Sequence, residues 1–131
     1  MREQNYDLEA RLLEYATCIV RLVEQLSSTR AGNHVAGQLL RSGTAALPNH
    51  GEAQAAESPA DFIHKMKVCL KELRESYRWL LLIRRVPLIE NESEASVLIK
   101  ETDELIRIFV KSIHTARKNE CESRIRTEST C

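Results

Sequence analysis

The sequence lacks any apolar run that reaches the roughly 18 residues expected of a membrane-spanning helix. Its first residues, Met1 to Asn5, are polar and mixed in charge, so they predict no signal peptide. Glycine and proline are scarce, with four and three residues in 131, which argues against a turn-rich β-sandwich and against a disordered chain. With 43% apolar and 29% charged residues, the composition predicts a soluble globular helical protein that binds no membrane.

A surplus of either charge is also missing, since 19 lysines and arginines balance 19 aspartates and glutamates. A dedicated polyanion binder usually carries a basic surplus, so only a local patch could support nucleic-acid binding. The cysteines show no Cys-x-x-Cys spacing, and we expect free thiols in a reducing cytoplasm. They are Cys18, Cys69, Cys121 and Cys131.

Four segments carry apolar residues at steps of three and four, and each is expected to form an amphipathic helix. The expected ranges are 6–26, 31–56, 58–86 and 91–118. The third segment has the clearest start, because Ser58 is a natural N-cap, Pro59 suits the first helical position and Asp61 stands where a capping-box carboxylate is found. Pro48 is expected to bend the second helix.

Long helices joined by short connectors favour antiparallel neighbours. We therefore predict one all-α domain over residues 1–118, an antiparallel up-down-up-down four-helix bundle. Residues 119–131 are polar and show no periodicity, which predicts a disordered tail.

Residue patterns typical of enzymes are absent. The sequence contains no phosphate-binding Gly-rich loop, no His-Glu-x-x-His and no Gly-x-Ser-x-Gly. Asp61 and His64 are the one pair that hints at a metal, but a carboxylate-bridged di-iron bundle needs two Glu-x-x-His repeats and two further glutamates. His114 has no carboxylate at a matching spacing. We expect no catalysis, no metal and no cofactor.

A row of positive charge on the third helix is the clearest binding signal. Its members are spaced by four, three, four and seven residues, which places them on one helical face. This basic stripe consists of Lys67, Lys71, Arg74, Arg78 and Arg85. Seven basic residues face three acidic ones between Ser58 and Val86, whereas the first 28 residues hold three basic and five acidic ones.

Two interpretations of the basic stripe remain open. It could contact phosphates, with Tyr77 and Trp79 beside it as base-stacking groups or as ordinary core aromatics. It could instead pair with the acidic first helix, within a subunit or between subunits.

One region resembles a known pattern: Ser42-Gly43-Thr44, then Asn49 to Ser58, Asp61 to Lys65, Cys69 to Ser76 and Tyr77 to Leu80. It is similar to the bacterial four helix bundle protein family, also described as the ribosomal-RNA intervening-sequence protein family. Related proteins are encoded inside intervening sequences of large ribosomal RNA genes. A similar bundle is the accessory subunit of the reverse transcriptase of diversity-generating retroelements, where it helps bind nucleic acid. The resemblance implies an antiparallel bundle that assembles into a ring-like homopentamer.

Two further groups of residues are candidates. The polar cluster of the family motif could accept a cation or a partner group, or it could tie backbone near Pro48 or across an interface. Its members are Asn49, Glu52, Glu57, Asp61 and His64. Gly43, Leu81 and Leu82 are expected at an oligomer interface.

The function expected from these features is a non-catalytic, homo-oligomeric binding or scaffolding module. Its candidate partner is a structured RNA or a nucleoprotein that the basic stripe contacts without reading bases. The alternative is a purely structural protein–protein interaction module with no nucleic-acid binding.

Overall fold

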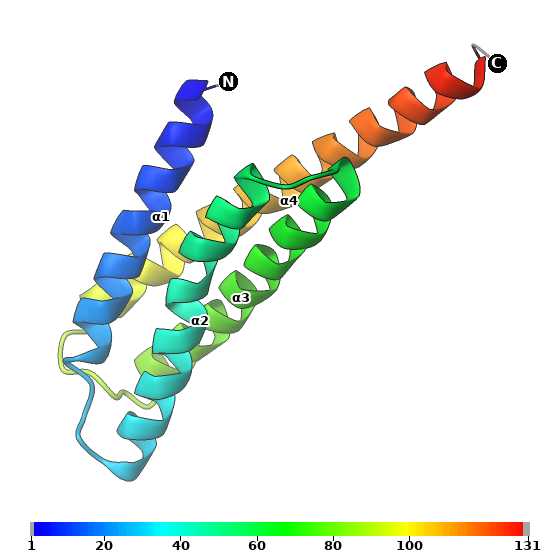
Figure 1. Cartoon of the computed structure of the whole chain (residues 1–131). Coiled ribbons are helices and arrows are strands. Elements are labelled where there is room, and N and C mark those ends of the chain that lie inside the picture. The colour runs from blue at the N-terminus through cyan, green and yellow to red at the C-terminus, as the bar shows by residue number, and fades with distance from the viewer. Residues whose placement is uncertain (1, 130–131) are drawn as a thin grey trace.

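The computed structural model describes residues 2–129, with side chains from residue 7 to 128, and this part of the chain forms four helices and no strand (Figure 1). The helices are α1 (Arg2–Val23), α2 (Arg30–Gln54), α3 (Pro59–Arg85) and α4 (Glu92–Ser129). They run antiparallel, and each packs against the next one in the chain, while α4 returns to contact α1. The predicted all-α four-helix bundle is confirmed.

Two helices begin at side chains that satisfy free backbone N–H groups. Thr29 Oγ1 accepts a hydrogen bond from the Gly32 amide at 3.1 Å, and Ser58 Oγ accepts one from the Asp61 amide at 3.1 Å. Pro59 is the first residue of α3, as its spacing predicts. These caps end the preceding connectors sharply, which keeps consecutive helices close together.

The two connectors at one end of the bundle are bonded to each other. The backbone amide and the hydroxyl of Ser27 both donate to the Leu88 carbonyl, at 2.9 and 3.1 Å. Leu88 and Ile89 are themselves buried. The connection between α1 and α2 is thereby joined to the connection between α3 and α4, and the end of the core is covered.

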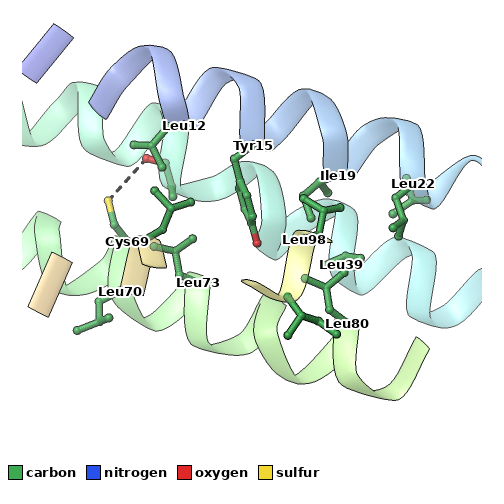
Figure 2. Close-up of a cluster of buried hydrophobic side chains, with 14 of the residues drawn as sticks. Leu12, Tyr15, Ile19, Leu22, Leu39, Cys69, Leu70, Leu73, Leu80 and Leu98 are labelled. Atoms are coloured by element: carbon green, nitrogen blue, oxygen red, sulfur yellow. Dashed lines mark hydrogen bonds between the residues drawn. The ribbon is translucent and has the colours of Figure 1, made fainter. Parts of the chain in front are cut away.

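The core is built from the apolar faces that the spacing predicts. Figure 2 shows side chains of α1, α2 and α3 meeting between the helices, with Ile19 and Leu22 on one side and Leu39 and Leu80 on the other. Each of these four side chains is almost fully buried. None of the described helices combines the length and apolarity that crossing a membrane requires.

Helix α4 is longer than the sequence predicts. It continues to Ser129, past the ends of the other helices (Figure 1), so the prediction of a disordered tail is wrong for residues 119–129. Nearly all of these side chains are exposed, because they lack an apolar row to pack. Local interactions still favour a helix there, as in the pair of Arg124 with Glu120 one turn earlier at 3.3 Å. Residues 130 and 131 lie outside the described part.

Candidate nucleic-acid interface

The basic stripe lies on the side of α3 that faces α4. All five of its residues are exposed. Helices α1 and α3 occupy opposite corners of the bundle, and they meet only through core side chains such as Tyr15 and Ser76. Among the described side chains no ion pair joins the stripe to α1, so the described part of the subunit offers no support for pairing with the first helix.

A groove between α3 and α4 contains three of the five stripe residues. Its volume is about 560 Å³. We call it the basic groove, and its lining is Lys67, Leu70, Lys71, Arg74, Val110, Ile113, His114 and Arg117. Four cations and one histidine thus surround a floor of three aliphatic side chains. No carboxylate belongs to this lining.

The acidic residues of α3 are turned away from the basic groove. Glu72 and Glu75 both bind the Arg41 guanidinium of α2, the first of them at 3.1 Å. Glu75 also accepts a hydrogen bond from the indole N–H of Trp79 at 3.2 Å. Because these carboxylates lie on the α2 side, they leave the α4 side of the helix with cations alone.

The cations of the groove have no acidic partner in the part of the chain that the structure describes. Among the described residues, no carboxylate lies within 4 Å of the charged ends of Lys67, Lys71, Arg74 or Arg117. Other ion pairs, such as Arg11 with Glu101 across α1 and α4, do form where opposite charges meet. The groove therefore presents uncompensated positive charge although the whole chain is neutral.

The remaining stripe residues lie outside the groove. Arg78 turns back along its own helix, where its guanidinium donates to the Arg74 carbonyl at 3.3 Å. Arg85 is the exposed last residue of α3. These two extend the positive face of α3 towards the connector that follows it.

The aromatic residues beside the stripe belong to the protein interior and the α2–α3 contact. Trp79 meets the ring of His34 edge to face, with 6.1 Å between centroids. Tyr77 is half-buried and packs against the core. Neither lines the basic groove, which agrees with their interpretation as core aromatics and not as base-stacking groups.

The wall that α4 contributes to the basic groove is not predicted from the sequence. Val110, Ile113, His114 and Arg117 recur at steps of three, one and three, which is the signal of a single helical face. The sequence patterns point to His114 only as a metal-ligand candidate, and they carry no prediction for Arg117. These residues can line the groove only because their face of α4 lies beside α3. The spacing of residues along α4 does not show which of its faces does so.

The polar cluster of the family motif does not converge on one point. Asn49 donates to the Ala45 carbonyl at 2.8 Å, one turn back along the proline-containing helix α2. Asp61 binds Lys65 at 3.1 Å, and this contact lowers the pKa of the Asp61 carboxyl. Glu52, Glu57 and His64 are exposed. The described residues contain no group of three metal-ligating side chains.

The residues predicted at an oligomer interface lie at different depths. Gly43 is buried against α1, where an added Cβ would stand 2.7 Å from Ile19 Cγ2, so it serves close packing of α1 and α2 within the subunit. Leu81 is half-buried against the core, whereas Leu82 is 41% exposed.

A buried histidine, His50, lies in the core, and the sequence patterns did not predict its burial. His50 is 1% exposed and meets the ring of Phe109 edge to face at 6.1 Å. Its Nε2 lies 3.2 Å from the Gln54 amide nitrogen, while its Nδ1 has no hydrogen-bond partner among the described residues. Burial lowers the pKa of His50, an effect that the charge of Glu9 partly offsets. We assign it to the core.

Comparison with known proteins places the chain among helical bundles of unassigned function. No curated protein matches it. A crystal structure from Bacteroides thetaiotaomicron, described as a protein of unknown function from the S23 ribosomal protein family, is 31% identical. That likeness covers 84% of this chain and 97% of the other, with a TM-score of 0.76. The model of the 23S rRNA-intervening sequence protein family matches residues 5–111. The chain therefore belongs to the 23S rRNA-intervening sequence protein family.

Proposed function

We propose that the protein is a non-catalytic, homo-oligomeric binding module whose basic groove contacts the phosphate backbone of structured RNA. The observation that carries this proposal is the lining of the groove, in which cations from two helices face each other with no carboxylate between them. Phosphate oxygens are the natural partners of such unpaired lysine and arginine side chains. In this role the groove positions the protein on RNA and leaves base sequence unread.

Oligomer formation strengthens this mode of binding. A single groove offers few phosphate contacts, and each contact adds only modest, salt-sensitive affinity. In a closed assembly each subunit carries one groove. Once one groove has bound the RNA, the neighbouring grooves meet the same RNA at a high effective concentration, so the overall affinity rises. A chain with no net charge can in this way hold RNA through one repeated patch.

A protein–protein scaffold is the second candidate, and exposed apolar side chains favour it. Leu13 is 56% exposed and Val20 is 42% exposed, and their spacing of seven places them on one face of α1. Leu40 of the neighbouring helix α2 is 40% exposed. Contacts between subunits through such side chains would require no nucleic acid.

The RNA proposal is tested by fluorescence anisotropy of a labelled RNA hairpin titrated with the protein. The titration is run at about 50 and 200 mM salt, because phosphate contacts weaken over that range. The test variant is Lys71→Glu with Arg74→Glu. Its matched control is Arg21→Glu with Arg30→Glu, which changes the net charge equally at exposed positions outside the groove. Light scattering coupled to size exclusion reports assembly for each protein.

We expect salt-sensitive binding that the groove variant loses and the control retains, with assembly unchanged in both. If the two variants lose binding equally, whole-molecule charge and not the groove holds the RNA. If the groove variant fails to assemble, the stripe is a subunit interface. Absence of binding at low salt would favour the scaffold.

A further inference from the structure

We infer that the basic groove is a two-walled clamp for the backbone of double-helical RNA, with His114 and Arg117 of α4 as its second wall. The inference rests on the proposed function and goes beyond it by naming the form of RNA that is bound. The second wall also lies outside residues 5–111, which the family model matches, so it is argued for this chain alone.

The two walls form a rigid frame. Leu70 and Leu73 of α3 and Phe109 and Ile113 of α4 are buried beneath the groove, so both helices are held along this stretch by shared core packing. At a rise of 1.5 Å per residue, the cations from Lys67 to Arg74 span about 10 Å along α3. The helices that carry these cations are therefore fixed relative to each other, which suits a ligand whose phosphates are themselves held in a fixed array.

A duplex supplies phosphates in that form. Double-stranded nucleic acid is stiff and carries a dense array of charges, whereas a single strand must be ordered when it binds. Cations on two facing walls can flank one phosphodiester strand of the duplex from both sides. The sequence predicts only the α3 wall, which by itself would contact the strand from one side.

The chemistry of the groove disfavours a single strand. Proteins that bind single strands without sequence preference combine a basic groove with aromatic side chains on which bases stack. The lining of this groove has no phenylalanine, tyrosine or tryptophan. Trp79 is engaged on the α2 side of α3, with Glu75 and His34.

The floor of the groove offers no group that reads bases. Leu70, Val110 and Ile113 offer no hydrogen-bonding group, and Val110 is 43% exposed, so that it can contact sugar edges. A carboxylate, which could accept from a cytosine amino group, is absent from the lining. Recognition through backbone and shape alone is also the usual way in which proteins bind double-stranded RNA.

The test compares anisotropy titrations of a labelled RNA duplex of about 16 base pairs, the length that double-stranded-RNA domains span, with an unstructured oligouridine of equal strand length. A second duplex of scrambled sequence measures base reading. Arg117→Glu probes the α4 wall. Lys111→Glu is its matched control, because Lys111 is exposed on the same helix and does not line the groove.

For the wild type, the expected Kd for duplex is at least about tenfold below that for the single strand, and scrambling changes it less than about twofold. Arg117→Glu is expected to weaken duplex binding about tenfold, and Lys111→Glu less than about threefold. Equal or tighter binding of oligouridine would overturn the inference, as would unchanged duplex binding by Arg117→Glu. Both results leave the proposed function standing if Lys71→Glu with Arg74→Glu still abolishes RNA binding. Failure to bind any RNA at low salt would instead remove the proposed function.

Discussion

The hydroxyl of Tyr15 on α1 lies 2.7 Å from Thr102 Oγ1 on α4, inside the core. Thr102 Oγ1 donates to the Leu98 carbonyl at 2.6 Å, so it accepts the bond from Tyr15. Ser42 of α2 and Ser76 of α3 are joined by a second hydroxyl pair at 2.8 Å. Among the described side chains each helix therefore contributes one buried hydroxyl, and none of these four oxygens lacks a hydrogen-bond partner. Such pairs favour one register of the four helices, since a shifted helix would leave buried polar groups unbonded.

Removal of the Tyr15 hydroxyl is expected to weaken the contact between α1 and α4. Tyr15→Phe deletes the donor and leaves the ring in place, so the free energy of unfolding should fall by about 1 kcal/mol. Urea titrations measure this loss. Tyr77→Phe is the control, because in the described structure the Tyr77 hydroxyl makes no hydrogen bond. An equal loss in both variants would show that the bond to Thr102 contributes nothing.

Alkaline pH should destabilise the protein through the same residue. Burial raises the pKa of Tyr15 from 10.0 to about 12, although hydrogen bonds with Thr102 and Ser76 partly oppose the shift. The unfolded chain therefore loses this proton first, and the corresponding stability, complete below pH 10, is lost as the pH rises towards 12. The difference in urea midpoint between wild type and Tyr15→Phe should shrink across that interval. A constant difference would contradict the assignment.

Acidic pH should act through His50. Because burial lowers its pKa below 6.5, the unfolded state takes up the proton first, and stability falls as the pH drops below 6.5 towards the folded-state value. Gln54 on the same helix, Phe109 on α4 and the charge of Glu9 on α1 surround the ring. His50→Gln should therefore reduce the dependence of the free energy of unfolding on pH between pH 7 and 5.

The control for this experiment is the exposed His64. His64→Gln should keep the wild-type pH profile, since this substitution leaves the buried His50 in place. If the two variants behave alike, the acid sensitivity of the bundle arises elsewhere.

Gly43→Ala should loosen the contact between α1 and α2. The new Cβ would stand 2.7 Å from Ile19 Cγ2 in a closely packed core, which costs about 1–3 kcal/mol. Gly37 lies in the same helix with open space around it, so Gly37→Ala should stabilise the protein by about 0.5–1 kcal/mol. Ile19→Ala removes the contacting Cγ atoms, so it should cost less stability in the Gly43→Ala background than in the wild type. Urea titrations of the wild type, the two single variants and the double variant would show this coupling. Absence of coupling would contradict a steric cause.

Single-charge removal should reveal which cations contact phosphate. Lys71→Ala is expected to lower RNA affinity and to reduce the slope of log K against log salt by about one unit, because one fewer counterion is released. Arg21→Ala, at an exposed site outside the basic groove, should leave that slope unchanged. The measurement is the same anisotropy titration at four or more salt concentrations. An unchanged slope for Lys71→Ala would place the phosphate contacts elsewhere.

Much of the fold was predictable because helix formation depends on residues three or four apart. The apolar spacing predicted four helices, and the N-cap at Ser58 was predicted from three neighbouring residues. The end of α4 was missed for the same local reason. Lack of an apolar row removes packing beyond residue 118 but does not prevent helical hydrogen bonding, which the pair Glu120–Arg124 supports.

The candidate site was only half predictable. The spacing from Lys67 to Arg74 placed three cations on one face of α3. It could not show that Arg41 would hold both glutamates on the other face, or that Arg117 would complete a groove. Both facts depend on how each helix is rotated about its axis relative to its neighbours.

The sequence by itself determined the number of helices, their apolar faces and the alignment of charge along α3, because these follow from the 3.6-residue period. Only the tertiary structure decided which faces meet. It set α1 diagonally opposite α3, and it set α4 beside α3, where Arg117 supplies a second basic wall. It also joined Tyr15 to Thr102, 87 residues away. Such long-range contacts arise because core packing fixes the rotation and order of the helices, and one helix's pattern does not contain that information.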